Sequence, residues 1–254
     1  MKTTATTTQV KSINKVSNFK NKLLSHGSTN SKTAKNQTIA ESYILHLSPY
    51  KSNSFGKNVC GNASAGCILG CLNTAGMGKF SNVQAARQRK TDFFFSDPVG
   101  FLTQLYRELY LVNAEAMLDN KAIAIRLNGT SDLDFIALFL NKLNKDILNE
   151  FTHLKFYDYT KNFNRAVKYL GSNYSLTFSR SETNDLECKK FLALGGNVAA
   201  VFNQLPESYL GYNVINGDIN DLRYLDPANV IVGLTAKGKA KKDNTNFVIN
   251  INSL

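Results

Sequence analysis

A chain of 254 residues with 43% hydrophobic content is long enough to bury one sizeable core, but it is short for two well-formed domains. Its apolar runs are far shorter than the roughly 20 residues that a membrane-spanning helix needs, and its N-terminus lacks the apolar core of a secretory signal. We therefore expect a soluble protein of a reducing compartment, with no membrane contact and no stable disulfides.

The net charge of +11 is concentrated near the N-terminus, where nine lysines and one acidic residue precede Val59 and give a balance of +8. Residues 1–38 are rich in Thr, Ser, Asn and Lys and lack apolar periodicity. They predict a basic, disordered arm ahead of a single α/β domain over residues 39–254. Such an arm is typical of a solubilising tail or of a segment that contacts nucleic acid.

Folding is expected to begin near SYILHL, and the segment VCGNASAGCILGCLNTAGMGKF follows. It contains three of the four cysteines, Cys60, Cys67 and Cys71, at the spacing C-x6-C-x3-C. Thiolates this close need a metal or a disulfide. Three ligands from one glycine-bearing loop are typical of a cluster with one open iron, so we expect a four-iron, four-sulfur (4Fe-4S) cluster.

Two alternatives to the cluster stay open. Zinc normally takes four ligands, and Cys188 is the candidate for the fourth, although its position in NDLECKKFLAL also fits a buried core residue. The other alternative is three free thiols. If CILGCL is helical, Cys67 and Cys71 share one face of that helix.

Two groups of basic residues could bind phosphate. Arg87, Arg89 and Lys90 lie on the helix expected for SNVQAARQRKTDFFF, and Lys237 and Lys239 follow a strand in AKGKAKKD. A solvated surface is the alternative explanation for each group.

From Ala122 onward, short apolar runs alternate with segments of helical periodicity. The expected strands are AIAIRL, LKFYDY, YSLTFS, NVAAVF, YNVINGD, VIVGLTA and FVINI, and the expected helices are LDFIALFLNKLNKDILNEF, KNFNRAVKYLG and NDLECKKFLALGG. This alternation predicts parallel strands. The short connections after NVAAVF favour a partial or irregular parallel β/α barrel, with the cysteine loop at its mouth, over a complete eightfold barrel.

Several of the expected strands end in polar residues. Because the carboxyl ends of parallel strands meet at one edge of a sheet, these residues are candidates for a shared catalytic site. The set is Arg126, Asp132, Asp158, Lys161, Glu182 and Asp218. Helix capping is the alternative explanation, and Asp132 and Asn184 are the expected N-caps.

The cysteine segment and the later blocks IRLNGTSDLDF, FYDYTKN, YSLTFSRSETN, GGNVAAVF and VINGDINDLRYLDP resemble a bacteriophage family named gene product eighty-eight. The resemblance covers most of residues 40–250. It implies a phage or prophage origin and the cytoplasm of the infected or lysogenic host, with a host protein as a candidate partner. It implies no particular activity or oligomeric state.

The chain is more distantly similar to radical S-adenosylmethionine enzymes, which combine a partial barrel with a three-cysteine loop, although their usual spacing is C-x3-C-x2-C. That similarity implies S-adenosylmethionine as a cofactor. We expect a cluster-dependent enzyme that acts on a nucleotide or nucleic acid. The implied cofactor-binding residues are Ser181, Asn184, Gly195 and Gly196. The alternative function is a non-catalytic nucleic-acid-binding or host-interaction protein in which zinc or a cluster staples the loop.

Overall fold

A computed structural model of the chain describes residues 19–29, 34 and 38–253. Within these residues the strands are β1 (Leu24–His26), β2 (Glu41–Leu45), β3 (Ile123–Arg126), β4 (Leu154–Thr160), β5 (Tyr174–Ser179), β6 (Asn197–Phe202), β7 (Ser208–Tyr209), β8 (Tyr212–Asn216), β9 (Ile231–Thr235) and β10 (Val248–Ile249). The α-helices are α3 (Ala65–Leu69), α4 (Ser81–Ser96), α5 (Pro98–Asp119), α6 (Phe135–Leu143), α7 (Ile147–Glu150), α8 (Phe163–Lys168) and α9 (Asp185–Ala193). Short 3-10 helices connect them, including η2 (Leu72–Thr74), η4 (Arg223–Leu225) and η5 (Gly238–Lys242).

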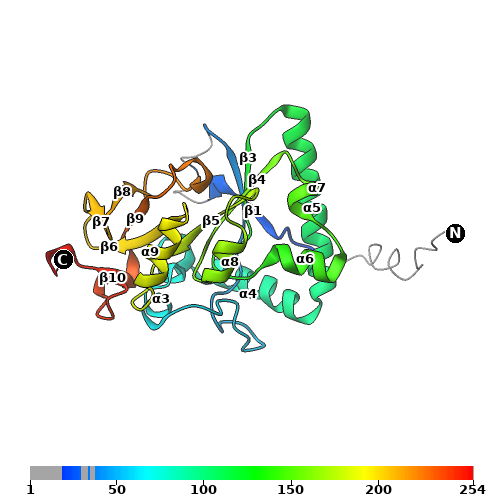
Figure 1. Cartoon of the computed structure of the whole chain (residues 1–254). Helices are drawn as coiled ribbons and strands as arrows, with labels where there is room; N and C mark the ends of the chain where they lie inside the picture. Colours follow the sequence, from blue (N-terminus) through cyan, green and yellow to red (C-terminus); the bar gives the residue numbers. More distant parts are fainter. Residues whose placement is uncertain (1–18, 30–33, 35–37, 254) are drawn as a thin grey trace, which may run out of the picture.

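The strands form one mostly parallel sheet of ten strands in the order β1-β2-β3-β4-β5-β6-β9-β8-β7, with β10 paired to β6 (Figure 1). From β2 to β6 each strand lies beside its successor and parallel to it, as connections through helices produce. The sheet is open along this path. The mixed α/β class, every strand expected after Ala122 and the helix around Arg87 are confirmed. The helix expected for LDFIALFLNKLNKDILNEF is two helices, α6 and α7, because the chain turns at Asn144, whose φ is +53°.

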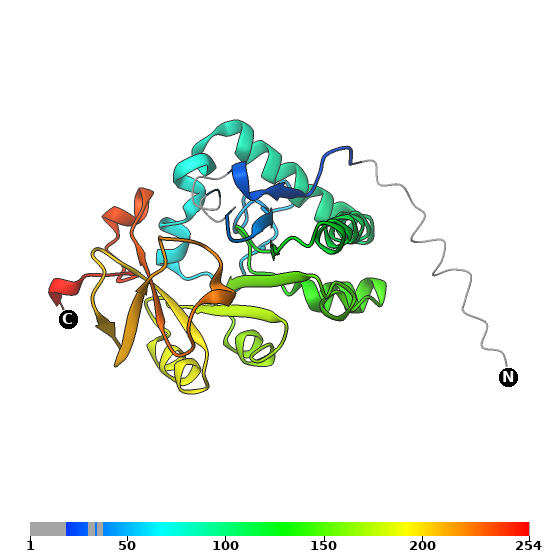
Figure 2. The same cartoon turned by 90° about the horizontal axis from the view of Figure 1, so that it is seen from above.

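The α-helices cover one face of the sheet. Successive side chains on a strand point to opposite faces, so neighbouring residues on one strand belong to different cores. On β4, Phe156 packs into the large core beneath α4, α5 and α6, whereas Tyr157 faces the opposite side. On that opposite side Tyr157 belongs to a small core with Ala124 and with Leu222, which directly precedes η4. Figure 2 shows α8 and α9 on the side of the strands opposite η4.

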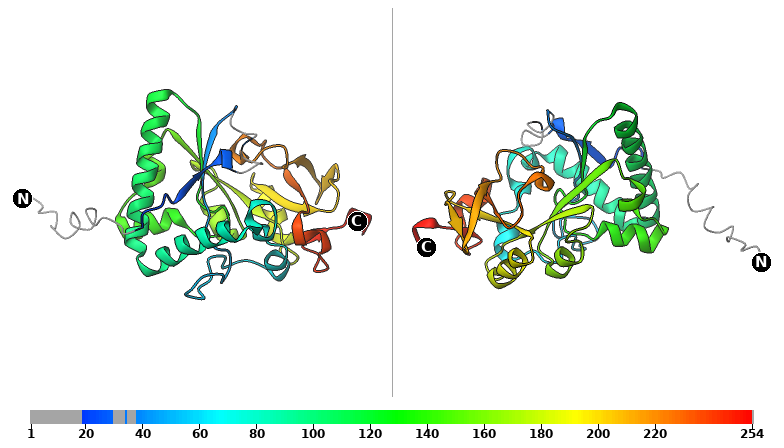
Figure 3. Two further views of the ribbon diagram at one scale, coloured as in Figure 1. Left: turned by 180° about the vertical axis from the view of Figure 1, so that it is seen from behind. Right: turned by 45° about the horizontal axis from the view of Figure 1, so that its top comes forward.

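Strand β10 brings the C-terminal segment to the carboxyl end of β5. One edge of β6 pairs with β9, and its other edge is shared: β5 pairs with Asn197–Ala199, whereas β10 pairs with Val201 and Phe202. The segment before β10 therefore lies where β5 and β6 diverge. Figure 3 shows this part of the chain close to the segment that contains α3.

The folded region begins earlier than residue 39, which corrects the expected domain boundary. β1 pairs antiparallel with β2, and Leu23 and Leu24 are buried in the large core. Glu108 on α5 accepts hydrogen bonds from the backbone N–H groups of both leucines at 2.8 Å, and Lys90 on α4 donates to the carbonyl of Leu23 at 2.6 Å. The rest of the expected arm, residues 1–18, 30–33 and 35–37, lies outside the described residues.

The predicted helix ends are largely correct. Gly195 follows α9 with a φ of +98°, as a C-terminal glycine should. The N-cap of α6 is Asp134, which accepts from the N–H of Ala137, and not Asp132 as expected. No helix in the described part of the chain has the length and apolarity needed to cross a membrane.

Candidate functional site: the cysteine loop

The three clustered cysteines lie on the irregular segment between β2 and α4. Cys60 follows the buried Val59, Cys67 lies within α3, and Cys71 directly precedes η2. Helix α3 ends at Leu69, so CILGCL is not one continuous helix and Cys67 and Cys71 do not share a helical face. All three thiols are free and half-buried.

Glu182 attaches this loop to the carboxyl end of β5. Its carboxylate accepts the hydroxyl of Ser64 at 2.6 Å and the backbone N–H of Gly66 at 2.8 Å. Partial burial opposes ionisation of Glu182, but these hydrogen bonds hold its pKa below the usual value. Ser64 in turn caps α3 by accepting from the N–H of Cys67 at 3.3 Å. The position of Cys67 therefore depends on a carboxylate 115 residues further along the sequence.

A close backbone approach fixes the other side of the loop. A Cβ atom at Gly66 would lie 2.3 Å from Oγ1 of Thr245 and 2.4 Å from Cβ of Phe247. Residues 245–247 lead into β10, so α3 packs directly against the segment that enters the divergence of β5 and β6. Only glycine fits this contact.

The three thiols lie within electrostatic range of one another. Burial raises the pKa of Cys60 to about 11; a hydrogen bond from the Tyr50 N–H opposes this, and the charges of Cys71 and Cys67 raise the pKa further. Burial also raises the pKa of Cys71, and Cys67 adds to that effect. The thiols of Cys60 and Cys71 are therefore protonated at neutral pH unless a bound cation stabilises their thiolates.

Arg87 is a buried cation beside Cys71. Its side chain extends from α4, its Nη1 donates to Oδ1 of Asn73 at 2.5 Å, and its Nε is buried without an acceptor. Among the described residues Arg87 has no carboxylate partner. Burial lowers its pKa, and the Cys71 charge is the neighbour that opposes this. A negative charge at the cysteine loop would complete its environment.

Three of the six predicted catalytic candidates surround this loop. Besides Glu182, these are Asp132 and Lys161. Asp132 forms an ion pair with Arg165 and accepts the backbone N–H of Lys161 at 3.0 Å. The charge of Asp132 raises the pKa of Cys60, and the charge of Lys161 lowers that of Cys71, so both lie close to the thiols.

Arg126 and Asp158 belong instead to buried contacts within the sheet. Asp158 is fully buried and accepts the hydroxyl of Tyr174 at 2.8 Å, and burial raises its pKa to about 6. Arg126 donates to Asp221 at 2.7 Å and lies 4.7 Å from the ring centre of Tyr159.

Asp218, the sixth candidate, forms an ion pair with Lys237 at 2.6 Å. Among the six residues, Arg126 and Asp158 form an ion pair at 3.7 Å, Asp132, Lys161 and Glu182 lie around the cysteine loop, and Asp218 is paired with Lys237. One site shared by all six stays a prediction.

His46 is a functional candidate that the sequence interpretation missed. It follows β2, and its Nδ1 is buried without a hydrogen-bond partner. Burial lowers its pKa to about 3, and the charges of Arg87 and Arg126 add to this effect. His46 is thus close enough to both Arg87 and Arg126 for their charges to act on it. The available signal was its position at a strand end, the same signal that identified Arg126.

The predicted cofactor residues are divided between the two edges of the sheet. Ser181 and Asn184 follow the carboxyl end of β5, whereas Gly195 and Gly196 precede the amino end of β6. The two glycines line a cavity of about 250 Å³ that also includes Arg223. The prediction that all four residues line one pocket is therefore wrong, because the glycines terminate a helix and the other two residues begin one.

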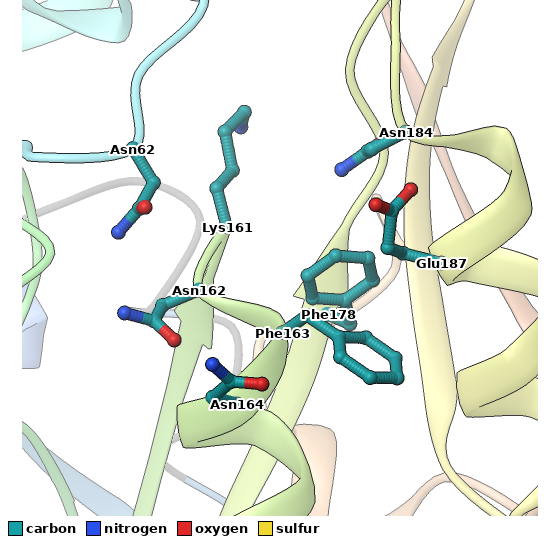
Figure 4. Close-up of a pocket in the computed structure, with 8 residues that line it drawn as sticks. All are labelled: Asn62, Lys161, Asn162, Phe163, Asn164, Phe178, Asn184 and Glu187. Atoms are coloured by element: carbon teal, nitrogen blue, oxygen red, sulfur yellow. The ribbon is translucent and has the colours of Figure 1, made fainter.

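A second cavity, of about 390 Å³, lies beside the cysteine loop (Figure 4). It opens between Asn62 of the loop and the N-terminal ends of α8 and α9. Its lining residues are Asn62, Lys161, Asn162, Phe163, Asn164, Phe178, Asn184 and Glu187. Lys161 and Asn184 are thus the predicted site residues that border a cavity next to the cysteines.

The first predicted phosphate-binding group is wrong for two of its three members. Arg87 and Lys90 are buried, and Lys90 is held by the Leu23 carbonyl, so only Arg89 is exposed on α4. Lys237 is exposed but paired with Asp218, and Lys239 is exposed on η5.

No three side chains among His, Cys, Asp and Glu are grouped as a metal site in residues 19–29, 34 and 38–253. Cys188 is fully buried in the core formed by α9, β6 and β9, which confirms its interpretation as a core residue.

These observations define an α/β protein with an open, mostly parallel sheet and a cysteine loop fastened to the carboxyl end of β5. The chain belongs to the Gene product 88 family, a family of bacteriophage gene products, whose model matches residues 18–251. The comparison with curated proteins and the comparison with solved structures gave no match. A relation to radical S-adenosylmethionine enzymes is not shown.

Proposed function

We propose that this protein is an iron-sulfur protein that holds one 4Fe-4S cluster on Cys60, Cys67 and Cys71. The proposal rests on three half-buried free thiols of one loop whose charges act on one another, and on Arg87 beside Cys71, a buried cation without a carboxylate partner among the described residues. Thiolates are the preferred ligands of such clusters. A cluster held by three thiolates would be the negatively charged partner that Arg87 otherwise lacks among the described residues.

The loop has the freedom that this proposal requires. The three sulfurs must come together around the metal. The loop between them can adjust, because its helices α3 and η2 are short and nothing packs within 4 Å of the Cβ position of Gly61. Binding the metal would deprotonate the thiols, so the free energy of coordination would drive the closure. The three sites with the clearest supporting contacts are the anchor at Glu182, the close approach at Gly66 and the cation at Arg87.

A bound cluster supplies one-electron transfer. The more specific prediction, an enzyme similar to radical S-adenosylmethionine enzymes that acts on a nucleotide or nucleic acid, stays a prediction. Lys161, Ser181 and Asn184 stay candidates for the cofactor site because they follow the carboxyl ends of β4 and β5. Gly195 and Gly196 are no longer candidates, because they precede the amino end of β6.

Cysteine substitutions test the ligand set. Anaerobically reconstituted protein should show the broad visible absorption of a cluster, and Cys60→Ala, Cys67→Ala or Cys71→Ala should each abolish it. Cys188→Ala is the matched control and should retain the absorption, because Cys188 lies in the core. A loop variant that keeps the absorption, or a control variant that loses it, would overturn the assignment of the three ligands.

A second candidate function is non-catalytic binding of a polyanion such as nucleic acid. In that case zinc or a cluster would only stabilise the structure of the cysteine loop. One observation favours it: η5 carries Lys239, Lys241 and Lys242, all exposed, and packs against the cysteine loop, where a Cβ at Gly70 would lie 3.2 Å from Cβ of Ala240. Exposed lysines in a row bind phosphates without sequence preference.

Salt-dependent binding tests this second candidate. Replacing Lys239, Lys241 and Lys242 together by Gln should reduce the slope of log affinity for RNA or DNA against log salt by about 2 to 3, since each phosphate contact contributes about 0.7 to 0.9. Arg87→Gln is the control and should leave the slope unchanged because Arg87 is buried. An unchanged slope in the triple variant would exclude η5 as the binding surface.

A further inference from the structure

The cavity beside the cysteine loop contains a cation and an anion that do not neutralise each other (Figure 4). Lys161 follows β4, and Glu187 lies in the first turn of α9. Figure 4 shows Lys161 on the side of Asn62 and Glu187 on the side of Asn184, with the two phenylalanine rings between them.

Neither charge has an oppositely charged partner elsewhere. The ammonium group of Lys161 lies 5.4 Å from the ring centre of Phe247, and no carboxylate pairs with it in the described chain. Glu187 likewise has no ion pair or hydrogen bond to its carboxylate from any described residue. Both are half-buried, so each loses part of its hydration without gaining a protein partner.

Among the polar side chains that line the cavity, two are held by backbone hydrogen bonds and two are available to contact a ligand. Asn162 caps α8 by accepting the N–H of Arg165 at 2.9 Å, and Asn184 accepts from Ser181 and donates to Ser179, so both are committed to the backbone. The exposed carboxamides of Asn62 and Asn164 have no such partner in the described residues.

Phe163 and Phe178 form the apolar base of the cavity. Their rings meet edge to face with centres 5.8 Å apart, and Phe178 is only 1% exposed, so Phe163 supplies most of the accessible apolar surface. The volume of about 390 Å³ is near the lower end of the range for small-molecule sites. The cavity therefore suits a small molecule with two opposite charges and an apolar part.

We propose that this cavity binds the α-amino-acid group of a small molecule that has an uncharged, apolar side chain. The carboxylate pairs with Lys161, the ammonium group with Glu187, and the apolar part lies on Phe163. Lys161 is also the cation whose charge reaches Cys71, so the carboxylate end of the ligand lies toward the cysteine loop. The site needs no metal, and it goes beyond the proposed cluster function.

Calorimetric titration with single compounds tests the proposal on the full-length protein. Methionine and phenylalanine should bind, whereas the matching amine without a carboxylate and the matching acid without an amine should each bind on the order of tenfold more weakly, the value of one charge-assisted hydrogen bond. Equal binding of all three forms, or no binding of either amino acid at millimolar concentration, would overturn the proposal. So would binding of a nucleotide in preference to the amino acids.

Two single substitutions assign the two ends of the ligand. Lys161→Gln should remove the preference for the amino acid over the amine, and Glu187→Gln should remove the preference over the acid. Lys142→Gln and Glu207→Gln, which neutralise exposed residues elsewhere, are the matched controls and should keep both preferences. Loss of both preferences in a control variant would contradict the assignment.

Repeating the titration with Cys67→Ala separates this proposal from the cluster. Binding that persists in this variant supports the cavity whether or not the wild-type protein holds iron. If binding disappears in Cys67→Ala, the independent site proposed here is wrong.

Discussion

Lys90 and Arg87 lie three residues apart on α4, and both are buried cations. Lys90 is explained by the fold, since it donates to the Leu23 carbonyl and lies near Glu108. The fold does not explain Arg87 in this way, because its side-chain neighbours among the described residues are Asn73 and the thiol of Cys71. At the scale of single residues, this difference is the reason for placing the metal beside Arg87.

The buried Lys90 should make stability depend on pH. Burial lowers its pKa from 10.5 to about 8, so between these values the unfolded chain binds more protons than the folded chain and the free energy of unfolding rises with pH. The unfolding free energy of the wild type minus that of Lys90→Met should therefore increase by up to about 3 kcal/mol from pH 7 to pH 10.5. Urea titrations at both pH values measure this. A difference that stays constant would show that Lys90 is not buried in this way.

Gly66→Ala should loosen the cysteine loop. The new Cβ would overlap Thr245 and Phe247, which form part of a packed segment, so we expect a loss of about 1–3 kcal/mol in unfolding free energy and poorer retention of iron. Gly61→Ala is the matched control from the same loop, since a Cβ there meets nothing within 4 Å. Similar losses in the two variants would contradict the close approach at Gly66.

At the scale of elements, β1 was hidden from sequence reasoning by its surroundings. It is three residues long and follows a segment rich in Lys and Asn, so no alternation could develop. Its pairing with β2 and the contacts of Leu23 with α4 and α5 are long-range and leave no local pattern. The strands from β3 to β6 were predictable because their apolar runs alternate with amphipathic helices.

Leu23→Ala should therefore destabilise the protein by about 2–5 kcal/mol, the usual cost of truncating a fully buried leucine. Leu118→Ala provides the control, because Leu118 is 78% exposed on α5 and should change the unfolding free energy by less than about 0.5 kcal/mol. Chemical denaturation measures both. If Leu23→Ala is as mild as the control, residues before 39 do not belong to the core.

At the scale of the whole molecule, the sequence predicted which strand ends carry polar residues but not how those residues pair. Asp132, Lys161 and Glu182 meet around the cysteine loop, whereas Arg126 is taken up by Asp221, which lies 95 residues away in sequence. Which residue each polar side chain pairs with depends on where η4 and the segment before β10 cross the sheet edge. Those segments are irregular, so their sequence shows no hydrophobic periodicity from which their positions could be predicted.

The central claim is that the cysteine loop holds an iron-sulfur cluster, and metal analysis of anaerobically purified protein tests it most directly. Protein purified without oxygen should contain about four iron and about four sulfide per chain, with little zinc. Stoichiometric zinc without iron would contradict the cluster and favour the structural role for the loop. Absence of both metals from protein reconstituted with iron and sulfide would leave three free thiols and contradict every metal assignment made for Cys60, Cys67 and Cys71.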